Sequence, residues 1–306
     1  MTRVSTFGNY QTALLNLMTA QTRSQQAQER ISTEKIATDL TGYGRGSETL
    51  TALKSSQARI QGYIQTGEAV AARLTAQDLA LNQVADGAGE ARQAISDALA
   101  AGSLDGLMLE LQGKFQMARN GLNAQHQGRY LFSGGQVQTT PTTVATMAEL
   151  ADAPDAGSVF TNDSLKQSTK LDEGSAVETG FLASDLGEDL YAIFRDIQLY
   201  HEATPITGAV SDETRDFLNA QLLRLDTTRI AITDHAARNG SLQNRVESIM
   251  DSQTARKTAL DGLISNRTDV DMAEAVTDLQ MSQVAIQASA QVITQLRDVS
   301  LLNFLR

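Results

Sequence analysis

The chain has 306 residues and is acidic, with 25 Lys and Arg residues against 36 Asp and Glu residues. Nucleic-acid-binding proteins usually carry a basic face, and anionic membrane surfaces repel an acidic chain, so we expect neither nucleic acid nor membrane as a partner. Because the sequence has no cysteine, disulfides, thiolate zinc sites and cysteine nucleophiles are excluded. The chain also lacks Trp and is rich in Ala, Gln and Leu, a composition that favours long packed helices over the core of a globular enzyme.

The N-terminal segment, residues 1–42, is predicted to be an assembly helix that is disordered in the monomer. It contains an apolar patch followed by Gln- and Ser-rich sequence, and an isolated amphipathic helix of this kind is marginal in water. One early Arg and no long apolar run precede the patch, which is not typical of a cleaved signal peptide. If the protein is exported, we therefore expect a route without such a signal. The patch consists of Tyr10, Leu14, Leu17 and Met18.

Residues 43–133 are predicted to form the N-terminal half of a helical core. From about Ser47 to Leu99, apolar residues recur in alternating steps of three and four, which indicates a long coiled-coil-like helix. Such a helix cannot build a compact core alone, so we expect a partner helix of similar length. The residues assigned to this core seam are Leu53, Ile60, Ile64, Leu74 and Leu81.

The middle of the chain, residues 134–187, has a different character. It is rich in Gly, Thr, Ser and Asp, and it contains Pro141 and Pro154, two of only three prolines. These features, with short β-prone pieces between them, predict a small β-rich insertion. The C-terminal half of the helical core is then expected over residues 188–266, with one helix ending near Asn239 and Gly240.

The C-terminal segment, residues 267–306, is predicted to be a second assembly helix. Its apolar residues again step by three and four, and its last residues are conspicuously apolar. The predicted fold is therefore mainly α, a long antiparallel coiled-coil-like bundle built from both chain ends, with a small β-rich central insertion. With the N-terminal patch, the predicted assembly interface comprises Met272, Val276, Leu279, Ile286, Ile293, Leu296, Leu301, Leu302 and Phe304.

No pattern in the sequence predicts catalysis. The three histidines, His126, His201 and His235, show no paired spacing, and the sequence has no phosphate loop, nucleophile elbow or dinucleotide fingerprint. The acidic cluster between Asp269 and Glu274 fits a solvated helix N-terminus, where the helix dipole favours negative charge. We therefore expect no enzyme activity, no cofactor and no metal site.

Three stretches resemble the flagellin superfamily. The run Glu29-Arg30-Ile31-Ser32-Thr33, followed by Asp39 and Gly42, is similar to an N-terminal flagellin segment and its acidic-glycine bend. The run from Ile264 to Ala275 is similar to the family's S-R-I-x-D-x-D-x-A-E pattern. The end of the chain, from Gln287 to Leu305, resembles the family's Q-A and S-L-L ending.

A further motif distinguishes branches of this superfamily. Tyr130, Leu131, Phe132 and Gly134 resemble the Y-L-F-x-G element of hook–filament junction proteins, which filament flagellins generally lack. The resemblance therefore favours a junction protein of the hook-associated type 3 kind, with a filament-forming flagellin as the alternative. A secreted enzyme on a flagellin frame and a coiled-coil signalling protein or secretion effector are further alternatives, and both account less well for these motifs.

The resemblance implies a structural role in the bacterial flagellum, outside the cell. Such proteins are exported through the flagellum's own secretion apparatus without a cleaved signal peptide, and their termini then assemble into an inner helical tube. The implied partners are other copies of the chain, the neighbouring hook-associated protein, flagellin and a cytoplasmic export chaperone.

Overall fold

The computed structural model describes residues 2–174 and 176–304, and the side chains of residues 8–174 and 176–296. This part of the chain is mainly helical, as predicted, and divides into two compact units: Met1–Arg59 with Arg256–Arg306, and Ile60–Ala255. The helices are α1 (Thr2–Thr33), a 3-10 helix η1 (Thr41–Gly46), α2 (Ser47–Ala101), α3 (Leu107–Leu122), α4 (Met147–Asp152), α5 (Ala183–Ala203), α6 (Asp212–Thr268) and α7 (Met272–Phe304). The strands are β1 (Gln125–His126), β2 (Arg129–Tyr130), β3 (Ser168–Lys170) and β4 (Ala176–Glu178).

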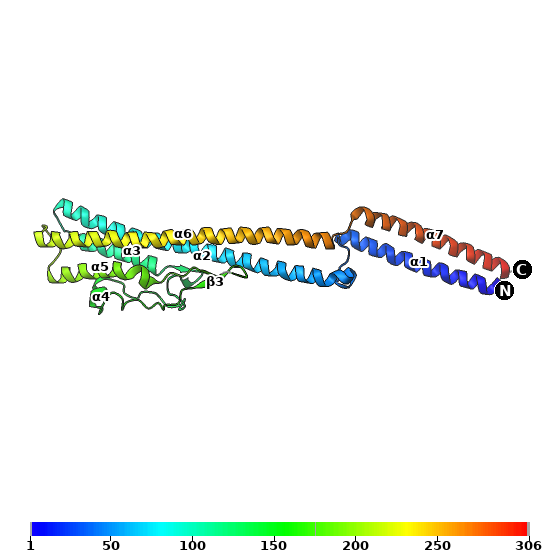
Figure 1. Ribbon diagram of the computed structural model, residues 1–306, viewed down its shortest axis with the longest axis horizontal. Helices are drawn as coiled ribbons and strands as arrows, with labels where there is room; N and C mark the ends of the chain where they lie inside the picture. Colours follow the sequence, from blue (N-terminus) through cyan, green and yellow to red (C-terminus); the bar gives the residue numbers. More distant parts are fainter. Residues whose placement is uncertain (1, 175, 305–306) are drawn as a thin grey trace. The chain divides into compact units, whose positions relative to one another are not determined.

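In the first unit, α1 and α7 lie side by side and run in opposite directions (Figure 1). Backbone hydrogen bonds join the segments next to them, with the Ile36 N–H donating to the Thr268 carbonyl at 2.8 Å and the Val270 N–H to the Glu34 carbonyl at 3.1 Å. The N-terminal segment is therefore helical in this structure. Its mobility in the isolated monomer stays a prediction.

In the second unit, α2 and α6 are antiparallel partners. The Arg92 side chain contacts the Asp226 carboxylate at 2.8 Å, and the Asn239 side chain donates to the Leu74 carbonyl at 2.9 Å. With α3 and α5 they enclose the main apolar core, in which Phe115 packs with ring centroids 5.0 Å from Tyr191. The long helix predicted from Ser47 thus has the partner that it needs.

The predicted helix end at Asn239 and Gly240 is wrong, because α6 continues through it from Asp212 to Thr268. Asn239 is fully buried, and its side-chain amide bonds the backbone of α2. An Asn-Gly pair ends a helix only where the backbone turns left-handed, and neither residue has a positive φ here. The tertiary contact with α2 overrides the local stop signal.

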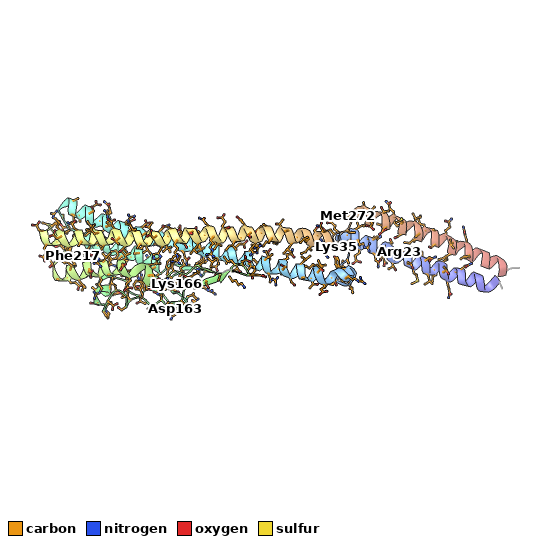
Figure 2. All side chains as sticks on the ribbon, viewed as in Figure 1. Arg23, Lys35, Asp163, Lys166, Phe217 and Met272 are labelled. Atoms are coloured by element: carbon orange, nitrogen blue, oxygen red, sulfur yellow. The ribbon has the colours of Figure 1, made fainter. Side chains whose placement is uncertain are left out.

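The middle of the chain holds small two-stranded sheets. β1 and β2 form a hairpin that precedes residue 134, and β3 and β4 form a second hairpin inside the predicted insertion. The insertion also contains the short helix α4, and α5 begins at Ala183. Its irregular backbone is fastened by side chains such as Asp163, whose carboxylate accepts from the Gly135 N–H at 2.8 Å (Figure 2).

Candidate assembly surface

The faces through which α1 and α7 meet consist largely of small side chains. On α1 the buried positions include Ala13, Ala20 and Ala27, seven residues apart, and on α7 they are Ala275 and Ser282. Spacing by seven keeps one stripe of a helix toward its neighbour, and small residues let two helix axes approach closely. The most deeply buried positions of this contact are therefore occupied by small residues.

Large apolar side chains lie on the outside of the same pair. On α1, Leu15 is 63% exposed, and Tyr10, Leu14 and Met18 are exposed as well. On α7, Met281 is 60% and Val284 65% exposed. Met272, Val276 and Val292 are also exposed on α7. Because an isolated helix pair would be more stable with its large residues between the helices, this arrangement presents apolar surface to other molecules.

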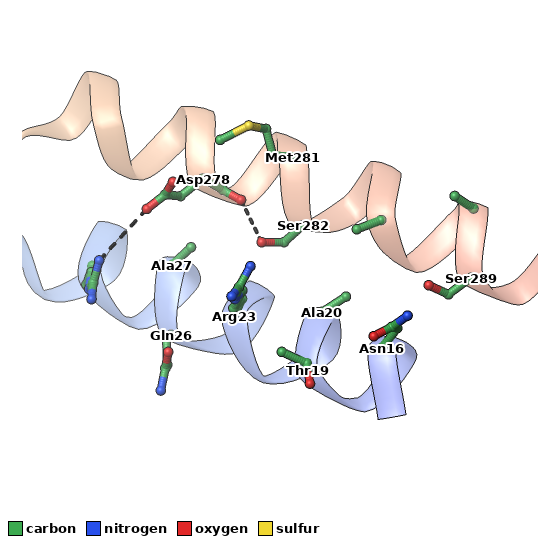
Figure 3. A pocket seen from close by; sticks show the side chains of 13 residues that line it. Asn16, Thr19, Ala20, Arg23, Gln26, Ala27, Asp278, Met281, Ser282 and Ser289 are labelled. Carbon is green, nitrogen blue, oxygen red and sulfur yellow. Dashed lines mark hydrogen bonds and ion pairs between the residues drawn. The ribbon is translucent and has the colours of Figure 1, made fainter. Parts of the chain in front are cut away.

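A groove of about 830 Å³ runs between α1 and α7 (Figure 3). Its lining residues include Ala20, Ala27 and Ser282. Arg30 contacts the Asp278 carboxylate at 3.9 Å across the pair, and the Ser282 hydroxyl donates to the Asp278 carbonyl within α7 at 2.6 Å. The small lining side chains leave the groove open.

Polar contacts hold the connection between the ends of α1 and α6. Lys35 forms an ion pair with Asp269, which also accepts hydrogen bonds from Ser265 and Thr268. The Lys35 ammonium, with these two hydroxyls, lowers the pKa of Asp269 from its ordinary value of 3.8 to about 2. Asp271 then caps α7 by accepting from the Ala273 N–H at 2.8 Å. The acidic cluster is thus a helix start with defined partners, as its position predicted.

The structure places the predicted interface residues on two different faces. Tyr10, Leu14, Met18, Met272 and Val276 are exposed, whereas Leu17 and four residues of α7 are half-buried toward the neighbouring helix. The side chains of Leu301, Leu302 and Phe304 lie outside the described residues. The four half-buried residues of α7 are Leu279, Ile286, Ile293 and Leu296.

Two groups of residues on this surface are not among the predicted interface residues. The inner stripe of small residues has a signal in the seven-residue spacing of Ala13, Ala20 and Ala27, which a search for large apolar residues passes over. The outermost side chains of α7, Met281 and Val284, were missed because they lie off the predicted stripe.

The predicted seam and motif residues lie in the second unit, except Leu53, which belongs to the first. Leu74 and Leu81 are fully buried, and Leu53, Ile60 and Ile64 are half-buried. In the motif, Phe132 is fully buried and Leu131 nearly so, Tyr130 is half-buried, and Gly134 has a φ of 70°. The motif therefore begins at the end of strand β2 and packs Leu131 and Phe132 into the core.

Among the described residues, no group of three or more His, Asp or Glu side chains is arranged to hold a metal ion. In the same part of the chain, no helix combines the length and the apolar character required to cross a membrane.

Comparison with known proteins identifies the C-terminal part of the chain. Residues 222–305 match the family described as the bacterial flagellin C-terminal helical region, which confirms the predicted resemblance there. No curated protein sequence matches the chain.

Two solved structures share the fold. A protein from Vibrio parahaemolyticus described as a flagellar hook-associated protein aligns with a TM-score of 0.61 and 16% identity, over 76% of this chain and 99% of its own. FlgL of Bacillus cereus aligns with a TM-score of 0.53 and 18% identity, over 70% of this chain and 97% of its own. At these identities the likeness concerns the fold.

Proposed function

Starting from the flagellin-type helical region at residues 222–305, we propose that this chain is a non-enzymatic structural protein of the bacterial flagellum that joins hook to filament. The observation that carries the proposal is the sorting of side chains on α1 and α7. The most deeply buried residues of the two helices are small, and several large apolar residues on both helices are exposed. A helix pair built this way is stabilised by neighbours that cover its outer faces.

The size of the effect supports assembly. Full burial of a Leu, Val or Met side chain contributes about 1.5–3 kcal/mol, and the outer faces offer several of these residues on each helix. Ordering of side chains and loss of free motion on association reduce the net gain. Copies that join head to tail repeat the same contact from one copy to the next. Such contacts build either a ring or an open helical tube.

The proposed partners follow from this role. Other copies of the chain, the neighbouring hook-associated protein and flagellin would cover the outer faces of α1 and α7 after export. Before export, a cytoplasmic chaperone would cover part of the same apolar surface, which otherwise favours aggregation. The fold shared with the Vibrio and Bacillus proteins supports a position in the flagellum. Export without a cleaved signal is part of the same proposal.

A pair of substitutions on α7 tests the proposal. Val284→Asp places a charge on the apolar outer face, and Gln287→Asp places the same charge less than one turn away at an exposed polar position. Each variant, as the only copy in cells, would be scored for motility and for filaments on the hooks. Circular dichroism and thermal melting of the purified monomers show whether both remain folded.

We expect Val284→Asp to leave the monomer folded and the hooks without filaments, and Gln287→Asp to assemble normally. Burial of an unpaired carboxylate in a copy-to-copy contact is costly, whereas the same group in water is not. Normal filaments with Val284→Asp would contradict an assembly role for this face.

A filament-forming flagellin is the second candidate, favoured by the family match of residues 222–305. The two functions differ in whether added copies of the chain continue to lengthen a filament. Purified chain added to short filament seeds would extend them into long filaments if it were a flagellin. A junction protein would add only to its own site and leave the seed length unchanged.

A further inference from the structure

A second, smaller cavity lies in the other unit, where the hairpin β1–β2 faces α2. Its volume is about 270 Å³. Arg73 reaches it from α2, His126 and Arg129 from the hairpin, and Gln167 and Thr169 from the segment that includes β3. None of the described residues that line it is acidic. In an acidic chain, this is a local concentration of positive and hydrogen-bond-donating groups.

The hairpin holds two of these groups on one face. His126 pairs directly with Arg129 across the strands, and side chains at paired positions point to the same side of a hairpin. The turn between them, Gln127 and Gly128, has φ values of 51° and 73°, the left-handed pair that a two-residue hairpin requires. The turn therefore fixes an imidazole beside a guanidinium without an acidic residue between them.

Arg73 has only neutral partners among its hydrogen bonds. Its guanidinium donates to the Gln167 side-chain oxygen and, at 3.4 Å, to the Thr179 carbonyl. Burial lowers the pKa of this guanidinium, and no carboxylate raises it. Buried charges in proteins are usually paired, because removing a cation from water is costly unless an anion or several hydrogen bonds replace the water.

His126 supplies an unused polar atom at the same place. Its Nε2 is buried and has no hydrogen-bond partner among the described residues. Buried polar side-chain atoms are satisfied in most structures, so an unpartnered one beside two guanidinium groups requires an explanation. An acceptor in the cavity would satisfy the imidazole and neutralise the cations together.

We propose that this cavity binds the carboxylate of a small organic acid, held by the Arg73 guanidinium, the His126 imidazole Nε2 and the Arg129 guanidinium. A planar carboxylate matches the planar fork of a guanidinium and accepts two of its hydrogen bonds. Val70, Leu131 and Val137 give the cavity apolar walls for the body of the ligand, and the small volume admits only a small molecule. The site is within the unit Ile60–Ala255 and does not depend on assembly.

The site also gives the Y-L-F-x-G motif a second role. Tyr130 and Leu131 line the cavity, and the residue before the motif, Arg129, supplies a cation. The Tyr130 hydroxyl is already engaged, since it accepts from Thr140 at 2.9 Å. Within the motif, Phe132 thus packs into the core, while Tyr130 and Leu131 line the proposed ligand site.

The test is an NMR titration of the full-length monomer with acetate and with succinate, at constant ionic strength maintained with chloride. Inorganic phosphate is titrated separately. Arg73→Met removes the half-buried charge at similar length, and Arg129→Gln removes the exposed cation with little risk to folding. Arg215→Gln makes the same change of charge at an exposed position of α6 that does not line the cavity.

We expect saturable shifts of the His126 and Arg129 signals with the carboxylates, and about tenfold weaker binding in each cavity variant. Arg215→Gln should bind as the unmodified chain does. Arg73→Met without ligand should melt at the same or a higher temperature, because a half-buried charge without an anionic partner has been removed. Absence of saturable shifts, binding of phosphate alone, or equal binding by Arg73→Met would each overturn the proposal. None of these results bears on the assembly of α1 and α7.

Discussion

Single positions on α2 show how sharply burial changes within one helix. Leu74 is fully buried against α6, whereas Leu79, five residues later, is 69% exposed. Leu74→Ala should lower the free energy of unfolding by about 2–5 kcal/mol, because it removes buried methyl groups and leaves a cavity. The matched control, Leu79→Ala, should change it by no more than about 0.5 kcal/mol. Urea unfolding of both variants measures the difference, and equal effects would refute the α2–α6 seam.

A second residue-scale prediction concerns pH. The folded pKa of Asp269, about 2, is below its ordinary value of 3.8. Its contacts therefore stabilise the folded state fully above about pH 4, and this contribution disappears as the pH falls toward 2. NMR titration of the carboxyl group should give the low pKa, and Lys35→Met should raise it toward 3.8. Amide exchange at Ile36 and Val270 should accelerate as Asp269 protonates. An ordinary pKa in the unmodified chain would contradict the ion pair.

At the scale of the element, two glycines of α3 have opposite surroundings. A methyl group at Gly121 would lie 2.7 Å from a methyl of Val84 and 2.9 Å from the Ala80 carbonyl oxygen of α2, whereas one at Gly113 would meet open space. The absence of a side chain at Gly121 thus sets how closely α3 approaches α2.

The same substitution at both glycines is expected to have opposite effects. Gly121→Ala should lower the free energy of unfolding by about 1–3 kcal/mol through overpacking. Gly113→Ala should raise it by about 0.5–1 kcal/mol, because alanine favours a helix interior. Denaturant unfolding distinguishes the two, and stabilisation by Gly121→Ala would mean that α3 and α2 are farther apart than the structure shows.

At the scale of the whole molecule, the proposed junction role predicts where the protein is found. Gold-labelled antibody against the chain should mark one narrow zone between hook and filament on intact flagella. A short stack of copies uses the outer faces of α1 and α7 without extending along the filament. Label distributed along the filament would instead support the flagellin alternative, and antibody against flagellin on the same flagella is the positive control.

The extent of α2 was predictable, but which of its residues face the neighbouring helices was not. The helix predicted from Ser47 to about Leu99 ends at Ala101, because absence of proline and regular apolar spacing are local properties. Strict steps of three and four give 3.5 residues per turn, whereas a straight helix has 3.6. The predicted stripe therefore moves gradually around the helix, away from the buried face.

The candidate site was predictable only in its location. Both chain ends carry apolar residues in excess of what a solvated helix needs, so their role as interaction segments could be read from composition and spacing. Which residues face inward could not, because an inner alanine and an exposed alanine look alike in sequence. Tyr10, Leu14 and Met18 are exposed on α1, and their role in the assembly interface stays a prediction.

By itself, the sequence determined that the chain is mainly helical at both ends, that it lacks thiol chemistry, and that it resembles flagellins. Each of these depends on residue type or on neighbours within a few turns. Only the tertiary structure decided that α6 continues through Asn239, that small residues pair α1 with α7, and that Arg73 meets His126 and Arg129 in one cavity. These features arise from contacts between residues distant in the chain, whose energies depend on the position and burial of both partners and not on either segment alone.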